Sequence, residues 1–355
     1  MKVAVGMRVR TGPWGGGNQF AAALGQFLQD RGVVVTDTLD SPDLDGILLT
    51  DPRRSSASSA FNDIDILRYL MEVNPRAVVV HRVNECDERK RTRMVNRRLE
   101  LANRCADRTV FISAWLRDLF VHRGSALAPA TIIRNGGERA LFRPGGRPWD
   151  GQEPLRLVTH HWGSHWMKGF DIYQRLDQLL EQPDFRKRFA FTYIGNLPTG
   201  FRFKNATMEP PQHGERLARL LQQHHVDLTA SRNEPAGMHH IEGALCGLPL
   251  LYCNSGALPE YCEGFGLCFD ESSFERQLLA MRRSYHIFKP LMDQYPYDAE
   301  RMCSSYLSLF TELVEQRREV LAERRWSSRQ SFRMRAHASL YDACYAWRLR
   351  LNALR

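Results

Sequence analysis

Residues 233–252 read NEPAGMHHIEGALCGLPLLY and place two carboxylates, Glu234 and Glu242, around a turn that holds Pro and Gly. The residues after Glu242 are typical of the rest of a short helix, which Gly247 ends as a left-handed cap. Residues 248–252 form an apolar run that predicts a buried parallel strand. The stretch therefore predicts a turn, a helix and a strand of an α/β protein.

The turn between the two carboxylates presents free backbone N–H groups. Those of Ala236, Gly237 and Met238 precede the helix, and a helix N-terminus attracts phosphate. Because carboxylates repel phosphate, Glu234 and Glu242 are better suited to accept hydrogen bonds from hydroxyl groups on either side of a diphosphate. Two polyol groups joined by a diphosphate describe a nucleotide sugar, and we expect these side chains to line an open cleft.

Strands and helices alternate along the rest of the chain, which predicts parallel sheets with crossover helices. Strands are expected at residues 2–7, 33–35, 46–49, 77–80, 109–112 and 131–133, and again at 155–159, 189–194, 226–229, 248–252 and 266–269. Helices with a buried face are expected at 18–31 and 169–180. Residues 135–154 hold five Gly and three Pro, which indicates a linker between two α/β halves. Ligands of such sheets bind at the carboxyl ends of the strands.

Composition favours a soluble globular protein, with 43% hydrophobic and 25% charged residues. No apolar run approaches the roughly 18 residues of a membrane span. Residues 2–7 enter a strand at once and lack the core of a signal peptide. The eight cysteines show no Cys-x-x-Cys pair, so we expect reduced thiols and a cytoplasmic location.

The positive charge gathers at the C-terminal end. Residues 315–355 hold ten Arg against four acidic residues, an excess of six within a net charge of +9. The remaining body is mildly basic, which argues against a nucleic-acid groove. Aromatic residues interleave with these arginines: Trp326, Phe332, Tyr341, Tyr345 and Trp347. The pattern suits peripheral contact with an anionic membrane, at the inner face, or a helical extension packed on the body.

The full Glu-Pro-x-Gly-x4-Glu-Gly-x2-Cys-Gly-x-Pro pattern resembles the Glu-x7-Glu signature of retaining glycosyltransferases with the GT-B fold, especially family 4. The resemblance implies that Glu242 holds the ribose hydroxyls and that Glu234 contacts the donor sugar. It extends from Gly15 to about Phe310, and implies an α/β protein of two Rossmann-like, doubly wound domains facing a central cleft.

The implied domains follow from the same resemblance. Residues 1–148 are the acceptor-side domain and 149–290 the donor-side domain. Residues 291–314 are a crossover helix that packs back on the first domain, and 315–355 form the Arg-rich helical tail.

Lys168-Gly169 is similar to the Lys-Gly of this family, which implies that the Lys168 ammonium contacts the donor diphosphate. That charge would stabilise the departing nucleoside diphosphate. The family usually has an arginine five residues earlier, where this chain has Gly163. His165 or Arg202 would have to compensate.

The glycine loop Trp14-Gly15-Gly16-Gly17 follows the first strand, and Phe20 excludes a dinucleotide fingerprint there because a small residue must pack at that point. The resemblance implies that Gly16 and Gly17 shape the donor pocket, a plain tight turn being the alternative.

His81 follows a predicted strand and matches a histidine placed beside the donor sugar, a structural histidine being the alternative. Asn196 fits the loop beneath the nucleotide, and Glu260, in Gly256-x-x-Pro259-Glu260, is a candidate for the pocket. Residues 207–208 fit the segment beside the base.

Two acidic pairs resemble the metal-binding Asp-x-Asp of another glycosyltransferase fold, but their positions favour structural roles. Asp43 and Asp45 stand just before a predicted strand, and Asp63 and Asp65 open a helix. A zinc site from His160, His161 and His165 is disfavoured because no Cys or carboxylate accompanies them. We therefore expect no metal and no cofactor.

The sequence thus predicts a metal-independent, retaining glycosyltransferase that moves a sugar from a nucleotide sugar to a saccharide or lipid-linked acceptor. The alternatives are a GT-B epimerase or phosphorylase, and a nucleotide-sugar-binding protein that lacks turnover.

Overall fold

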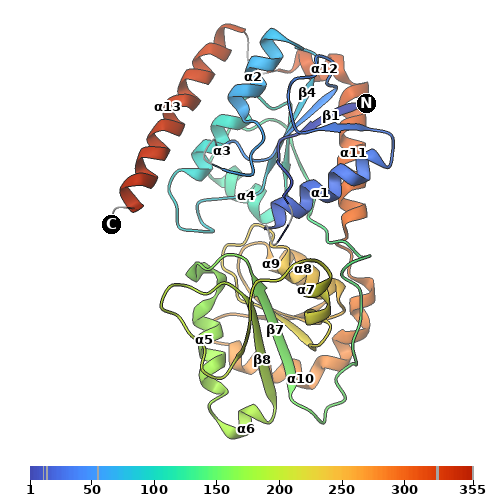
Figure 1. Cartoon of the computed structure of the whole chain (residues 1–355), viewed down its shortest axis with the longest axis vertical. Helices are drawn as coiled ribbons and strands as arrows, with labels where there is room; N and C mark the ends of the chain where they lie inside the picture. The colour runs from blue at the N-terminus through green and yellow to red at the C-terminus, as the bar shows by residue number, and fades with distance from the viewer. Residues whose placement is uncertain (11, 13–14, 54–55, 325–327, 354–355) are drawn as a thin grey trace. The chain divides into compact units, whose positions relative to one another are not determined.

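The computed structural model describes residues 1–10, 12, 15–53, 56–324 and 328–353 (Figure 1). For residues 328, 329, 345, 346 and 348–353 it describes the backbone alone. The side chains of Trp14, Trp326 and Tyr345, which the sequence analysis singled out, therefore lie outside the described residues.

The chain forms two compact units. The first comprises residues 1–10, 17–134 and 300–355, and the second comprises residues 11–16 and 135–299. Each contains one sheet of six parallel strands. The two parallel sheets confirm the predicted α/β class.

The sheet of the first unit has the strand order β2-β1-β3-β4-β5-β6. Its strands are β1 (Lys2–Val5), β2 (Val34–Thr36), β3 (Gly46–Leu49), β4 (Val78–Val83), β5 (Arg108–Phe111) and β6 (Ala130–Ile132). Its helices are α1 (Gly16–Gln29), α2 (Asp63–Glu72), α3 (Val95–Asn103), α4 (Ala114–His122), α11 (Ala299–Glu315), α12 (Arg317–Ala322) and α13 (Ser328–Ala353).

Both faces of this sheet are buried. Successive side chains of a strand point to opposite faces, and in β1 they enter two different apolar clusters. Val3 and Val5 of β1 pack in one apolar cluster, whereas Ala4 packs in another. Tyr306 and Phe310 of α11 belong to the first cluster, so α11 completes the core of this unit although it follows the second unit in sequence.

The sheet of the second unit has the strand order β12-β11-β10-β7-β8-β9. Its strands are β7 (Leu155–His161), β8 (Phe189–Gly195), β9 (Thr207–Glu209), β10 (Val226–Thr229), β11 (Leu250–Cys253) and β12 (Gly266–Phe269). Its helices are α5 (Phe170–Leu179), α6 (Pro183–Arg186), α7 (Gly214–Leu221), α8 (His239–Leu245), α9 (Leu258–Cys262) and α10 (Phe274–Phe288), with short 3-10 turns η1 (Trp166–Lys168) and η2 (Lys289–Gln294).

Each of the predicted strands overlaps an observed strand, and Gly247 adopts the expected left-handed conformation with φ of 82° after α8. Strand β9, which is three residues long and lies at the edge of its sheet, was not predicted from the sequence.

The two Asp-x-Asp pairs have structural roles, as predicted. Asp45 pairs with Arg317 at 2.7 Å, and Asp63 pairs with Arg98 at 2.5 Å. Asp65 closes a capping box at the start of α2 by accepting from the backbone N–H of Asn62.

The C-terminal tail is part of the first unit. Helix α13 runs beside α2 and α3 (Figure 1), and its Asp342 pairs with buried Arg98 at 2.8 Å. Before it, Arg324 donates to both carboxylate oxygens of Asp107 and to the carbonyl of Ala77. The described part of the tail thus packs on the body, which is one of the two possibilities that the sequence left open.

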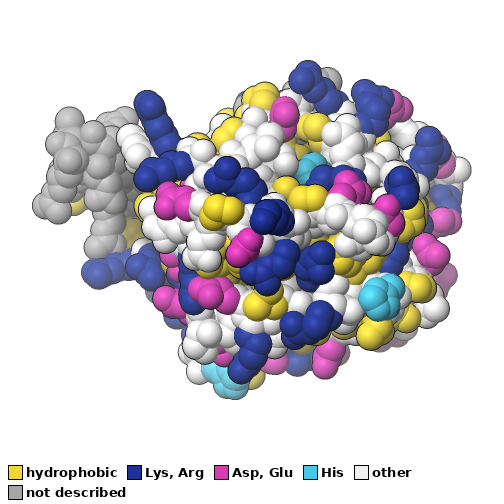
Figure 2. Space-filling view, turned by 90° about the horizontal axis from the view of Figure 1, so that it is seen from below, with side chains coloured by type: hydrophobic (Ala, Val, Ile, Leu, Met, Phe, Trp, Pro, Cys, Tyr) yellow, Lys and Arg dark blue, Asp and Glu magenta, His cyan; other side chains and the backbone are white. Residues whose placement is uncertain are grey.

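Charged side chains of both signs are interspersed over the face that Figure 2 presents. Within the described ranges, no helix is long and apolar enough to span a bilayer. All eight cysteines are free thiols.

Candidate functional site

The first predicted carboxylate, Glu234, lies in a tightly held loop between β10 and α8. Its neighbour Asn233 has a φ of 50°, in the left-handed region that few side chains adopt. The Glu234 carbonyl accepts from the N–H of Ala257 at 2.9 Å. A Cβ at Gly256 would lie 2.5 Å from the backbone nitrogen of Glu234, so the turn after β11 must have glycine at that point. The loop thus fixes Glu234 from both sides.

Glu234 and Lys168 form a buried ion pair. Lys168 Nζ donates to Glu234 Oε2, and the two side chains are only 6% and 3% exposed. Lys168 ends η1 after β7, 66 positions from Glu234 in the sequence. The structure therefore brings together the predicted contacts of the donor sugar and of the diphosphate.

The second predicted carboxylate, Glu242, is held by a histidine from β7. His160 Nε2 donates to Glu242 Oε2 at 2.6 Å, and the Glu242 side chain is 3% exposed. Among the described residues, no group bonds to Glu242 Oε1. A buried acceptor without a hydrogen bond lowers the stability of the folded state by roughly 1–3 kcal/mol, and a ligand hydroxyl that donates to Oε1 would restore this energy.

The expectation that Lys168, Glu234 and Glu242 line an open cleft is wrong. Their relative exposures are 5%, 2% and 2%. The cause is mutual pairing, since each charge lies against an opposite or hydrogen-bonding group in the interior.

A further carboxyl group, that of Asp227, lies near Glu242 and His160. Asp227 on β10 is fully buried, and a Cβ at Gly243 of α8 would lie 2.4 Å from its Oδ2. Burial raises the pKa of Asp227, His160 opposes this shift, and the Glu242 carboxylate adds to it, so that the pKa is about 7. Asp227 is thus poised between its neutral and charged forms near neutrality.

The backbone amides of Ala236, Gly237 and Met238 lie in the turn before α8. Within the described part of the chain, none of the three donates to a backbone acceptor. Asn135 Nδ2 donates to the Ala236 carbonyl at 3.1 Å, which ties the predicted linker to this turn. A Cβ at Gly16 would lie 2.5 Å from Met238 Cγ, so the glycine loop approaches the same turn and has no room for a side chain.

Three more histidines, for which the sequence predicted no role at this site, pack around the two pairs. The Tyr173 hydroxyl lies 2.8 Å from His161 Nε2, and His239 Nε2 lies 2.6 Å from Thr229 Oγ1. Burial lowers the pKa of His161 and of His239 well below 6.5, and lowers the pKa of His240 to about 3. All three are neutral at neutral pH. The signal in the sequence was that His239 and His240 lie between the two glutamates of the Glu-x7-Glu pattern.

Among the described residues, no three His, Cys, Asp or Glu side chains come together as a metal-binding group would require.

The position of the missing arginine lies beside Lys168. A Cβ at Gly163 would lie 3.4 Å from the His165 ring and 3.7 Å from Lys168 Cε. The His165 ring therefore lies beside the position at which an arginine was expected, whereas Arg202 is exposed in the loop after β8.

Two further candidates lie in the same unit. Asn196 follows β8, and its Nδ2 donates to the Trp162 carbonyl at 2.8 Å, which joins the ends of β8 and β7. Glu260 lies in α9, where its carbonyl accepts from the Tyr297 hydroxyl at 3.0 Å.

His81 and Gly17 belong to the other unit. His81 is fully buried within β4, which continues to Val83, and its Nδ1 accepts from Asn103 Nδ2 at 3.1 Å. Burial lowers the pKa of His81 to about 3, so the ring is neutral. A Cβ at Gly17 would lie 3.2 Å from Met7 Cε.

No family model matches the sequence, and no curated protein matches it. Solved structures do match the fold. Sucrose-phosphate synthase from Thermosynechococcus elongatus aligns with 88% of this chain and 99% of its own, with a TM-score of 0.63 and 14% identity. Anabaena HepE, solved with UDP and glucose, aligns with 88% of this chain and 100% of its own, with a TM-score of 0.63 and 14% identity.

A glycosyltransferase from Rickettsia africae ESF-5 aligns with 88% of this chain and 98% of its own, with a TM-score of 0.58 and 11% identity. At such identities the likeness shows the fold. The chain has the two-domain GT-B fold of these glycosyltransferases, as predicted.

Proposed function

We propose that this protein is a retaining glycosyltransferase that transfers a sugar from a nucleoside-diphosphate sugar to a saccharide or lipid-linked acceptor. The observation that carries the proposal is the buried cluster at the carboxyl ends of β7 and β10, where Lys168 pairs with Glu234 and His160 pairs with Glu242. The GT-B fold, shared with a protein solved with UDP and glucose, supports the same conclusion.

In this proposal each pair presents one group to the donor. His160 orients Glu242 so that Oε1, which has no partner among the described residues, accepts from a ribose hydroxyl. Glu234 orients Lys168, and an ammonium with three donors can bind a diphosphate oxygen while it keeps this contact. The amides of Ala236, Gly237 and Met238 add donors to the diphosphate.

Catalysis then rests on position and charge. Lys168 stabilises negative charge on the departing nucleoside diphosphate, and Glu234 contacts the donor sugar. The acceptor attacks the anomeric carbon on the face that the diphosphate leaves, and the diphosphate takes the acceptor proton. Because Lys168 and the amides supply the positive charge, the reaction proceeds without metal and survives excess EDTA.

The remaining predicted contacts belong to the proposal as well. Gly16 borders the Met238 turn, Gly17 continues that loop, and Asn196 and Glu260 border the nucleotide.

One observation favours a second candidate function, a nucleotide-sugar-binding protein without turnover. Gly163 stands where an arginine is expected, so the positive charge at the diphosphate is smaller. His165, beside Gly163, replaces that charge only when it is protonated.

The experiment that tests the proposal incubates the protein with UDP-, GDP- and ADP-sugars, with and without EDTA, in the presence of an acceptor panel. Transferase activity releases nucleoside diphosphate in both conditions, and NMR of the product shows the donor's anomeric configuration. Donor binding without any release would instead favour the binding protein. A free epimer or a sugar phosphate as the product would identify an epimerase or a phosphorylase.

A further inference from the structure

Helix α13 carries an exposed apolar stripe. Phe332, Leu340 and Trp347 are 68%, 65% and 66% exposed. Their spacings of eight and seven residues correspond to about two helical turns each, so they share one face over about 22 Å. The opposite face holds the helix to the body, through buried Ser331 and Ala338 and through the Asp342–Arg98 pair. The stripe is therefore the free face of α13.

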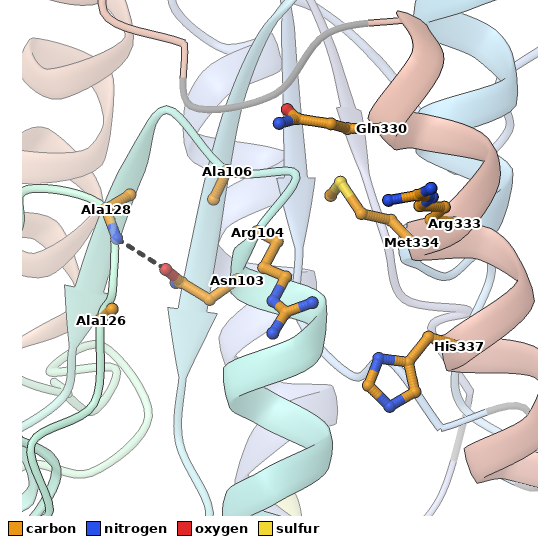
Figure 3. A pocket seen from close by; sticks show the side chains of 9 residues that line it. All are labelled: Asn103, Arg104, Ala106, Ala126, Ala128, Gln330, Arg333, Met334 and His337. Carbon is orange, nitrogen blue, oxygen red and sulfur yellow. Dashed lines mark hydrogen bonds between the residues drawn. The ribbon is translucent and has the colours of Figure 1, made fainter.

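A basic cavity of about 360 Å³ lies next to this stripe, between α13 and the end of α3. Figure 3 shows Arg333, Met334 and His337 of α13 facing Arg104 across it. Its apolar lining comes from Met334 and three alanines, and no described side chain that lines it is acidic. Among the described residues, neither Arg104 nor Arg333 has an ion-pair partner.

We propose that the free face of α13 lies on an anionic phospholipid bilayer. Phe332, Leu340 and Trp347 enter the boundary between headgroups and acyl chains, as the apolar face of an interfacial helix does. Arg104 and Arg333 bind lipid phosphates at the mouth of the cavity. This surface belongs to the first unit, and the proposal does not depend on glycosyl transfer.

Charge decides between a bilayer and a second copy of the chain. Residues 328–353 contain five Arg and one acidic residue, Asp342, which already pairs with Arg98. Two copies packed through α13 would set arginines against arginines, whereas an anionic bilayer complements them. The exposed Phe, Leu and Trp also favour a bilayer over nucleic acid, whose phosphate backbone offers no apolar surface.

The test is co-sedimentation of the full chain with vesicles of phosphatidylcholine, or of phosphatidylcholine and phosphatidylglycerol in equal parts. The charge variant is Arg104→Glu with Arg333→Glu, and the stripe variant is Phe332→Ser with Leu340→Ser and Trp347→Ser. The control is Arg283→Glu with Ile287→Ser on α10, where Ile287 is 61% exposed. All substituted side chains are exposed, so the variants should keep the wild-type melting temperature.

We expect the wild type and the control to bind the mixed vesicles and not phosphatidylcholine alone. Each arginine contributes about fivefold to partitioning, and the introduced glutamates repel the anionic lipid, so the charge variant should bind at least roughly 25-fold more weakly. The stripe variant should bind the mixed vesicles at least about tenfold more weakly than the wild type. Equal sedimentation of wild type and both variants would overturn the proposal. So would a dimer in solution that the stripe variant dissociates, or binding of the charged face to duplex DNA but not to vesicles.

Discussion

The buried Lys168–Glu234 pair predicts a large and specific loss of stability. Lys168→Met keeps the length of the side chain and removes its charge, which leaves the Glu234 carboxylate, 3% exposed, without its ammonium partner. Breaking a buried pair in this way costs about 3–5 kcal/mol. For a unit of this size, each kcal/mol lowers the melting temperature by about 2–4 °C, so the expected decrease is roughly 6–20 °C.

The assay is thermal denaturation followed by circular dichroism, with two further variants. Lys168→Met with Glu234→Gln removes both charges and should recover most of the stability, while transfer activity stays lost. Lys187→Met is the matched control, because Lys187 and Asp184 form a pair whose side chains are 77% and 89% exposed, and it should change stability by less than about 1 kcal/mol. A Lys168→Met variant as stable as the wild type would refute the buried pair.

Three more outcomes are expected. The Asp227 pKa is raised from 3.8 to about 7, so the folded state loses stability as pH rises through that window. The free energy of unfolding of Asp227→Asn, measured by urea denaturation, should therefore exceed that of the wild type by on the order of 4 kcal/mol at about pH 8 and match it at about pH 4. Equal stability at both pH values would contradict this. Arg324→Ala leaves the Asp107 carboxylate, which is 1% exposed, without its arginine partner, and should lower the free energy of unfolding by about 3 kcal/mol in thermal denaturation. Arg318 is exposed, so Arg318→Ala should change stability little. Gly16→Ala places a Cβ 2.5 Å from Met238 Cγ and should weaken nucleoside diphosphate binding by roughly tenfold in titration calorimetry. Gly15→Ala is the control and should leave binding unchanged, because no atom lies within 4 Å of a Cβ at that position.

Local patterns in the sequence predicted the fold because they reflect local physics. Buried strands need apolar runs, and Gly247 has the left-handed φ that ends α8. Strand β9 escaped prediction because three residues, two of them exposed, carry no periodic apolar pattern.

The contacts of the site could not be predicted in the same way. Glu234 and Lys168 are 66 positions apart, and Glu242 and His160 are 82 positions apart, so their pairing depends on the order of strands in the sheet. Asp227 belongs to an apolar strand and no motif marks it, so the sequence gives no sign of its burial below Glu242. The position of the tail depends in the same way on Arg98 and Asp342, 244 positions apart.

The most direct test of the proposed donor site is isothermal titration of the wild type and of Glu242→Ala with UDP, GDP and ADP. Glu263→Ala, an exposed glutamate of the same unit, is the control. Loss of charge-assisted hydrogen bonds to the ribose is worth roughly 1.5–3 kcal/mol, so one nucleotide should bind the wild type and the control about 10- to 100-fold more tightly than Glu242→Ala. Equal affinity of a folded Glu242→Ala variant, or no binding of any nucleotide to the wild type, would contradict the account.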